Sequence, residues 1–189
     1  MLLKYLDEID EALKHELYFA ALTLALVIPD ICGKAEYPNK SVGDRYRDWF
    51  EENIGQYEKE PVQEGQEEFP YLSGEVVYKL RCSMLHQGNP NVEKDSIHNE
   101  VCQIDHFILV LEKKNELDIY ADSSSISHGK WINNDGTETL EPVVKTYKVN
   151  VCRLCFLICT LARQYYEKNT EKFNFFDFEI EDWRKQRKY

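Results

Sequence analysis

The sequence predicts a mainly α-helical bundle that carries a small inserted antiparallel β-sheet. Before residue 99 and after Asn150, apolar residues recur every three or four positions, which is the spacing of amphipathic helices. Between Ile104 and Lys148 the pattern changes to short apolar runs separated by turn residues, which is typical of strands. The chain of 189 residues is long enough to bury an ordinary core. We therefore expect a single domain over residues 1–189, with the β insertion at about 102–149.

The first predicted helix runs from about Leu6 to Ile28. It is apolar nearly all round, which places it at the centre of a bundle. Pro29 should end or kink it, because proline lacks the amide hydrogen and clashes with the preceding turn. Ser41 is the expected cap of a second helix that reaches Gly55.

Residues 57–68 are rich in glutamate and contain a proline and a glycine, so we expect a solvated acidic connector. The last long helix should begin at the cap Asn150 and end near Lys168. Its apolar face includes three cysteines. The aromatic residues that follow are too many to leave in water and should pack back onto the bundle or onto a second subunit. They are Phe173, Phe175, Phe176, Phe178 and Trp183.

Three strands are expected in the insertion. The run from Ile104 to Leu111 is apolar at both alternating positions, which favours a strand covered on both faces. A second strand is predicted around 117–120 and a third over 142–147, with turns between them. Together they suggest a small antiparallel sheet.

The helix that follows Ser73 is the segment of greatest functional interest. Ser73 is a plausible N-cap, and Gly88 followed by Pro90 is the matching stop signal. Arg81 lies inside the apolar arc of this helix, so its guanidinium needs a partner, because an unpaired buried charge is costly. His86 follows five residues later, about 140° around a regular helix. The apolar arc consists of Val76, Val77, Leu80, Met84 and Leu85.

Arg81, four intervening residues, His86 and then Gly88 at a helix end resemble the signature of HEPN domains. These domains are helical bundles whose catalytic members are metal-independent RNases of toxin–antitoxin and phage-defence systems. The chain also resembles a group of uncharacterised bacterial proteins that contain such a bundle. The resemblance covers residues 6–99 and 150–168 and leaves out the sheet. One departure is Cys82, since catalytic members usually carry Asn, Asp or His after the arginine.

The resemblance implies a site in which Arg81 and His86 are catalytic and Cys82 and Gly88 are supporting residues. His86 would act as the base on the ribose 2′-OH and then protonate the leaving 5′ oxygen, while Arg81 would steady the charge on the phosphorus. No metal or other cofactor is required. The partners implied are a second copy of the chain in a homodimer, an RNA substrate, and an antitoxin or other protein.

Two other interpretations of this helix remain open. The protein could be a non-catalytic member of the family that binds a partner protein or a nucleotide, which agrees with Cys82 and with the acidic composition. Alternatively, Arg81 and His86 could only cap the helix end or bond to nearby carboxylates. A site at a two-fold interface would allow the divergent Arg81 and His86 side chains to meet those of a partner chain.

Other clusters of reactive residues have simpler explanations. Cys152, Cys155 and Cys159 have the spacing of a buried helix face, and no second pair of ligands completes a zinc site. We therefore expect core packing there. Two further groups lack a recognisable catalytic motif and are expected at the surface or in turns. The first is His98, Asp105 and His106, and the second is Asp118, Ser123, Ser124, Ser125 and His128.

Charge and cysteine usage indicate the surroundings of the protein. A formal net charge of -11 argues against a broad nucleic-acid-binding surface, although a small basic cleft at a dimer interface is compatible with it. The six cysteines lie mostly in apolar patterns, as in a reduced cytosolic protein. Acidic residues precede the first apolar run, so it does not resemble a signal peptide, and residues 17–28 are too few to span a bilayer. We expect a cytoplasmic protein with no membrane partner.

Overall fold

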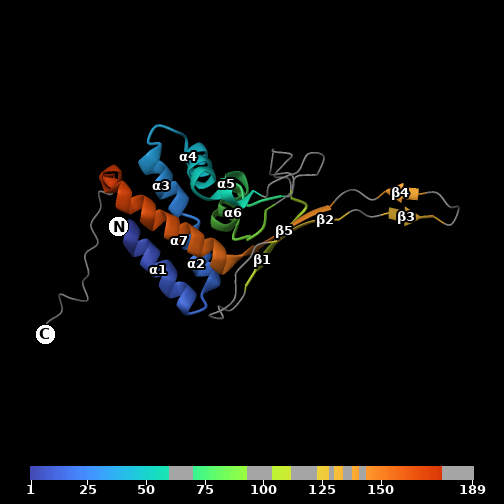
Figure 1. Cartoon of the computed structure of the whole chain (residues 1–189). Helices are drawn as coiled ribbons and strands as arrows, with labels where there is room; N and C mark the ends of the chain where they lie inside the picture. The colour runs from blue at the N-terminus through green and yellow to red at the C-terminus, as the bar shows by residue number, and fades with distance from the viewer. Residues whose placement is uncertain are drawn as a thin grey trace.

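The computed structural model describes residues 1–59, 70–92, 104–111, 123–127, 130–133, 138–140 and 144–175. The α-helices are α1 (Leu2–Lys14), α2 (Tyr18–Ala25), α3 (Ile28–Glu36), α4 (Val42–Phe50), α5 (Gln56–Glu58), α6 (Gly74–Cys82) and α7 (Val151–Lys168). The strands are β1 (His106–Val110), β2 (Ser123–Ser127), β3 (Lys130–Ile132), β4 (Glu138–Leu140) and β5 (Val144–Asn150). Two π-helical turns, η1 (Glu51–Gly55) and η2 (Ser83–Gln87), extend α4 and α6, and a short 3-10 helix, η5 (Thr170–Phe173), follows α7. The mainly helical class is confirmed (Figure 1).

The prediction of one helix from Leu6 to Ile28 is wrong. The chain breaks after α1, where Glu16 takes a left-handed φ of 57° and the Leu17 amide donates to the Ala12 carbonyl at 2.8 Å. It then continues as α2 and α3. Pro29 does not end a helix but lies in the first turn of α3. Proline is tolerated there because first-turn amides have no acceptor within the helix.

Three predicted helix caps are confirmed. The Ser41 hydroxyl accepts from the Asp44 amide at 3.3 Å, and the Ser73 hydroxyl accepts from the Val76 amide at the same distance. The Asn150 side chain accepts from the Arg153 amide at 3.1 Å. Each bond satisfies an amide that the first turn of its helix leaves unpaired. The predicted span of α7, from its cap at Asn150 to Lys168, is confirmed as well.

The second predicted helix extends further than expected. Through η1 and α5 it reaches Glu58, so the connector expected to begin at residue 57 starts later. Glu58 is also not solvated, because its carboxylate accepts from Arg153 of α7 at 2.7 Å. The rest of that connector, residues 60–69, lies outside the described residues.

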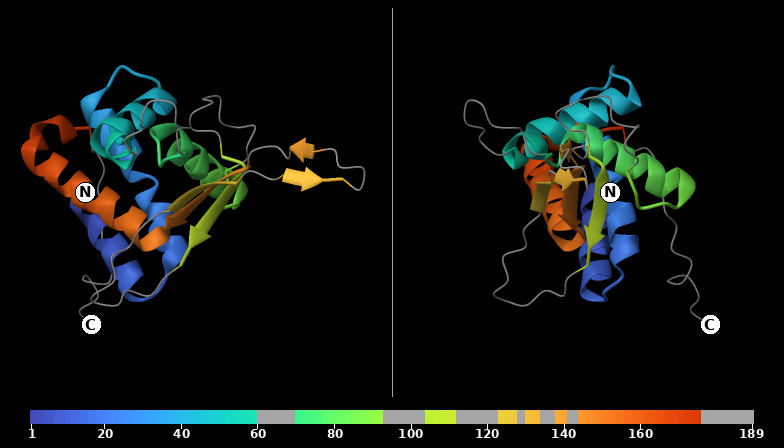
Figure 2. Two further views of the ribbon diagram at one scale, coloured as in Figure 1. Left: turned by 45° about the vertical axis from the view of Figure 1, so that its right-hand side comes forward. Right: turned by 90° about the vertical axis from the view of Figure 1, so that its right-hand side faces the viewer.

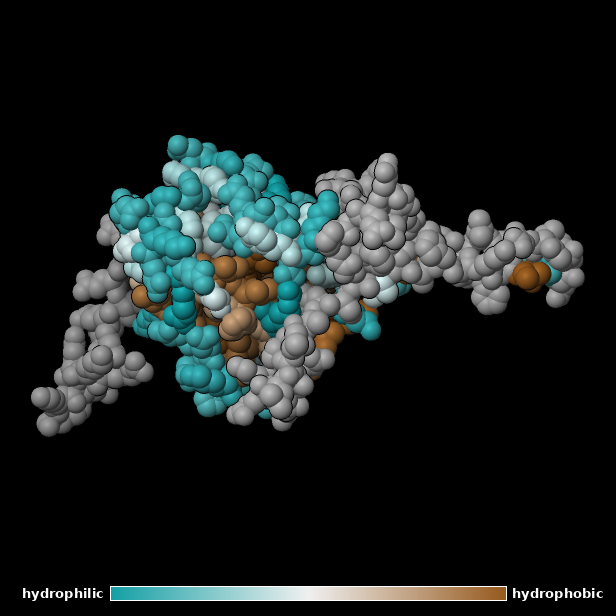
Figure 3. All heavy atoms as spheres, viewed as in Figure 1, coloured by the Kyte–Doolittle hydropathy of each residue, from teal (hydrophilic) through white to brown (hydrophobic). Residues whose placement is uncertain are grey.

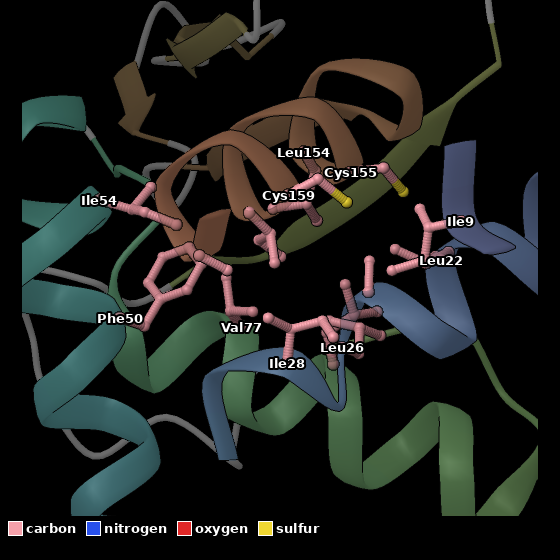
Figure 4. Packing of buried hydrophobic residues seen from close by; sticks show 14 of the residues in the cluster. Ile9, Leu22, Leu26, Ile28, Phe50, Ile54, Val77, Leu154, Cys155 and Cys159 are labelled. Atoms are coloured by element: carbon pink, nitrogen blue, oxygen red, sulfur yellow. The ribbon is translucent and has the colours of Figure 1, made fainter. Parts of the chain in front are cut away.

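The core lies where α7 packs among the other helices, and Figure 4 shows its buried side chains. Hydrophobic residues also reach the surface of the helical part, among hydrophilic ones (Figure 3). Cys155 and Cys159 point into the core beside Leu154, as the helix spacing predicted, whereas Cys152, which was expected to pack there as well, is only half-buried. Trp49, Tyr46 and Phe50 of α4 are among the largest fully buried side chains. Of the aromatic tail, Phe173 is buried and packs against Tyr165 and Tyr166, while Phe176, Phe178 and Trp183 lie outside the described residues.

The prediction of an antiparallel sheet is wrong for one of its strand pairs. β1 runs parallel to β5, with Phe107 opposite Tyr147, whereas β2 is antiparallel to β5. β3 and β4 form a separate antiparallel hairpin that extends away from the bundle (Figure 2). Parallel strands need a long connection, and residues 111–143 supply one. All of these strands fall between residues 106 and 150, after α6 and before α7.

Two details of the strand predictions also need comment. The third predicted strand, 142–147, corresponds to β5, which begins at Val144 and continues directly into the cap of α7. The prediction that β1 is covered on both faces is wrong, because Ile108 is 41% exposed. The strand expected around 117–120 lies outside the described residues.

One stretch has the length and composition of a membrane-spanning helix. It runs over Tyr18–Glu36, has a mean hydropathy of 1.4, and is half buried inside the protein. The core helix of a soluble protein passes the same test, so this stretch is weak evidence for a membrane span. It includes the whole of α2 and α3, which pack against α7.

Candidate active site

Two glycines let α3 and α6 cross α4 without intervening side chains. A Cβ on Gly33 of α3 would lie 2.4 Å from the carbonyl oxygen of Arg45. A Cβ on Gly74 of α6 would lie 2.4 Å from the carbonyl oxygen of Arg47. Real Cβ atoms do not approach so closely, so only glycine fits at either crossing. This close packing brings Arg81 of α6 near side chains of α3 and α4.

Asp30 of α3 lies between two arginines. Arg45 donates from Nε at 3.0 Å and from Nη2 at 2.8 Å to the Oδ1 atom of Asp30. Arg81 faces the other carboxylate oxygen, with its Nη2 atom 3.6 Å from Oδ2. The three side chains are 15% to 20% exposed. One carboxylate therefore serves two guanidinium groups, which leaves an excess of one positive charge.

Arg81 itself is poorly satisfied. Its 3.6 Å contact with Asp30 is too long for a hydrogen bond. Its Nε atom is buried and has no hydrogen-bond partner. Leaving a buried donor unpaired costs about 1–3 kcal/mol. The guanidinium lies 6.0 Å from the centre of the Tyr46 ring, which gives only a weak cation–π contact.

Asp30 is a residue that the sequence interpretation missed. Arg81 was expected to need a partner, and Asp30 is that partner among the described residues. A signal was present, because Asp30 is the sole acidic residue between Leu17 and Ala35 in a strongly apolar stretch. A charge in such a stretch points to a pairing role.

Two tyrosines lie near Arg81. The Tyr46 hydroxyl donates to the Leu26 carbonyl at 3.0 Å, and the Tyr46 ring lies 5.3 Å from that of Tyr78. Burial raises the pKa of Tyr46, while the charge of Arg81 opposes that rise. Burial also raises the pKa of Tyr78, helped by Cys82 beside its hydroxyl. Cys82 thus contacts Tyr78 in the position where a polar residue was expected after the arginine.

The turn that carries His86 is π-helical rather than α-helical. Each residue of a π-helix turns the chain through a smaller angle, because its hydrogen bonds join residues five apart. The wider turn of η2 therefore reduces the angle of about 140° that separates Arg81 from His86 on a regular helix. His86 is exposed and has no hydrogen-bond or ion-pair partner among the described residues.

Gly88 ends this helix as predicted. It has a left-handed φ of 64°, a conformation that glycine adopts without strain. The Gly88 amide donates to the Met84 carbonyl at 3.2 Å, and the Asn89 amide donates to the Ser83 carbonyl at 3.1 Å. These hydrogen bonds close the wide turn and fix the backbone that carries the His86 side chain.

The remaining candidate residues do not assemble a second site among the described residues. Cys155 and Cys159 are buried free thiols, and burial raises the pKa of both. No group of three or more metal-binding side chains occurs in the described part of the chain. The Asp105 carboxylate accepts from the Lys145 amide at 2.6 Å, so it is engaged in the sheet. His106 is exposed at the start of β1, and Ser123, Ser124 and Ser125 lie on β2, whereas His98, Asp118 and His128 lie outside the described residues.

Comparison of the chain with protein-family models, with curated proteins and with solved structures finds no match.

Proposed function

We propose that this protein is a metal-independent endoribonuclease of the HEPN type, acting in bacterial defence or as a toxin, with Arg81 and His86 as its active pair. The observation that carries the proposal is the state of Arg81. Its guanidinium is largely buried and lies near Asp30, yet none of its donors makes a hydrogen bond to a described residue. The hydrogen-bond donors of such a guanidinium are available to an anionic ligand.

The chemistry assigned to each residue follows from its position. His86 is exposed on η2, so its imidazole can approach a ribose and exchange protons with the 2′-OH and then with the leaving 5′ oxygen. Arg81 can donate two parallel hydrogen bonds to a phosphate and stabilise the charge that builds on it. The largely buried setting strengthens that interaction, because less water screens it.

The proposed active form is a cytoplasmic homodimer. Even on a wider turn, Arg81 points toward the α3–α4 side of the bundle and His86 points into solvent. A two-fold axis close to η2 would bring the arginine of one protomer to the histidine of the other. The net charge of -11 fits a small basic site better than a broad RNA-binding surface. A protein antitoxin is the expected regulator.

A second candidate function is binding of a partner protein or a nucleotide without catalysis. The observation that favours it is the environment of Cys82, which lies against Tyr78 and supplies no strong polar group to the site. The contact between Arg81 and Asp30 within one chain also agrees with a structural role for Arg81.

Expression in a bacterial host separates the two functions. We expect the intact protein to stop growth and Arg81→Ala or His86→Ala to relieve the arrest. His15→Ala is the matched control, because His15 is also an exposed histidine near a helix end and should leave toxicity intact. Purified protein should cleave RNA in the presence of a metal chelator. Equal growth of all four strains, together with no cleavage in vitro, would favour the binding function.

A further inference from the structure

Asp30, Arg45 and Arg81 form a cluster whose net charge indicates which kind of phosphate the site prefers. We infer that, because of the charge of Asp30, the site binds the singly charged phosphodiester inside an RNA strand in preference to a doubly charged terminal phosphate. This inference rests on the proposed function, since it names the phosphate that the same site binds. It assigns Asp30 a role in specificity rather than in the chemical step.

Asp30 is fixed independently of Arg81. Its carboxylate accepts two hydrogen bonds from Arg45, at 2.8 and 3.0 Å, and both use the same oxygen, Oδ1. The Arg45 backbone in turn lies against Gly33, one turn further along α3. The carboxylate therefore keeps its place, and its charge stays in the site, whether Arg81 is near it or turns toward a ligand.

Arg81 breaks no hydrogen bond when it turns toward a phosphate. Its contact with Asp30 at 3.6 Å is not a hydrogen bond, so none is broken when the guanidinium moves. Its buried Nε atom has no partner, and a new position offers that donor an acceptor. A phosphate therefore supplies charge-assisted hydrogen bonds that the ion pair with Asp30 lacks.

Within the described part of the chain, the neighbouring ion pairs do not alter the balance. Arg47 lies 2.8 Å from Asp44 and 3.3 Å from Glu75, and Lys79 lies 3.8 Å from the same Glu75. These two cations and two carboxylates cancel. Counted over the described residues, the excess of one positive charge thus belongs to Asp30, Arg45 and Arg81.

An excess of one positive charge matches a phosphodiester. A phosphate dianion in this largely buried cluster would keep one uncompensated negative charge. Moving an ion out of water costs more as its charge rises, so the cluster disfavours the dianion. Neutralising Asp30 raises the excess to two. Because Coulomb energy scales with the product of the charges, the added charge favours a dianion about twice as strongly as a monoanion.

Two small phosphates test the inference without any cleavage step. Dimethyl phosphate carries one charge, and methyl phosphate carries nearly two at pH 8, since its second pKa is about 6. Binding is followed by the NMR signal of the Arg81 Nε–H group, assigned from its loss in Arg81→Gln. In the intact protein we expect dimethyl phosphate to bind at least as tightly as methyl phosphate. In Asp30→Asn we expect affinity to rise about threefold for dimethyl phosphate and about tenfold for methyl phosphate.

Two controls complete the test. Asp48→Asn removes an equal charge from α4, where Asp48 pairs with Lys40 at 2.7 Å, and should leave the ratio of the two affinities unchanged. If Asp30→Asn does not fold, Arg45→Gln lowers the excess charge to zero and should weaken methyl phosphate more than dimethyl phosphate. An unchanged ratio in the variant that folds, or tighter binding of methyl phosphate by the intact protein, would overturn the inference.

The outcome is separate from that of the expression test. If the Arg81 signal responds to the phosphates as expected but the protein cleaves no RNA, the assignment of Asp30 stands and the catalytic proposal fails. If the protein cleaves RNA but Asp30→Asn leaves the ratio unchanged, the assignment of Asp30 fails and the catalytic proposal stands.

Discussion

The buried hydroxyl of Ser73 starts the helix that carries the candidate site. Ser73 is 3% exposed and accepts from the Val76 amide at 3.3 Å. Ser73→Ala leaves that amide without a partner away from water, so we expect the free energy of unfolding to fall by about 1 kcal/mol. Urea denaturation measures the loss.

Ser83→Ala is the control for the capping effect. Ser83 lies in the middle of the same helical run, and its hydroxyl makes no hydrogen bond to a described residue. We expect its loss to be within about 0.5 kcal/mol of zero. If the free energy of unfolding fell equally in the two variants, the capping hydrogen bond of α6 would not be the source of the loss in Ser73→Ala.

At the scale of elements, Gly74 decides how closely α6 can approach α4. A methyl group at Gly74 would meet the Arg47 carbonyl oxygen at 2.4 Å, and a backbone atom cannot move aside alone. Gly74→Ala should therefore separate the two helices and lower the free energy of unfolding by about 1–3 kcal/mol. It should also displace Arg81, so the Nε–H signal of Arg81 should shift.

Gly43→Ala is the matched control on α4. A Cβ at Gly43 would meet only the ends of flexible side chains, the Tyr78 hydroxyl at 3.1 Å and Arg47 at 3.3 Å. Those groups can move, and alanine favours a helix over glycine, so stability should change little. If Gly74→Ala were as well tolerated as Gly43→Ala, the close crossing of α4 and α6 would not be needed for the fold.

Local signals explain which elements could be predicted from the sequence. Ser41, Ser73, Asn150 and Gly88 act within one helical turn, and each marks a helix end where the structure has one. The break at Glu16 had no such signal, because its apolar flanks continue the helical spacing on both sides. α1 and α2 both pack against α7, so the break agrees with a demand of tertiary packing that no local signal carries.

The candidate site was only partly predictable for the same reason. The need of Arg81 for a partner followed from its own helix, and the structure supplies Asp30. The identity of that partner depends on how α3, α4 and α6 cross, which is long-range information. The π-helical winding of η2 also has no residue signature, so the relative direction of Arg81 and His86 could not be deduced from a regular helix.

At the scale of the whole molecule, Glu36 connects α3 to the C-terminal part of the described chain. Its carboxylate accepts from the Tyr165 hydroxyl at 2.5 Å and from Lys172 at 2.6 Å. The hydrogen bond from Lys172, followed by that from Tyr165, lowers the pKa of Glu36 below its ordinary 4.5. A lowered pKa stabilises the fold above the pKa of the unfolded chain, and this gain disappears as the pH falls through the folded pKa.

Glu36→Gln should therefore be less stable than the intact protein at pH 7, and the difference should shrink as the pH falls below 4.5, the ordinary pKa of Glu36. Thermal unfolding over pH 3–7 measures the difference. Glu167→Gln is the control, because Glu167 is exposed near the end of α7 and pairs with no described residue. A deficit that stayed constant across this pH range would show that the charge of Glu36 is not its source.

The proposed dimer makes the strongest claim about the whole molecule, and mixed subunits test it. When Arg81→Ala and His86→Ala chains are co-expressed, a site shared across the two-fold axis has one intact copy in each mixed dimer. That copy combines the arginine of one chain with the histidine of the other. We expect co-expression to restore growth arrest and RNA cleavage to a substantial fraction of the intact level, although each variant alone is inactive.

If both residues of a site came from one chain, every subunit of the mixture would lack one of them, and activity would stay absent. Sedimentation of the mixed sample must show that dimers form, so that a negative result refers to the site and not to failed assembly. Restored activity would show why Arg81 can remain beside Asp30 while His86 faces solvent. Each side chain would then serve the site of the neighbouring protomer, and the divergence of the two within one chain would be a requirement of the shared site.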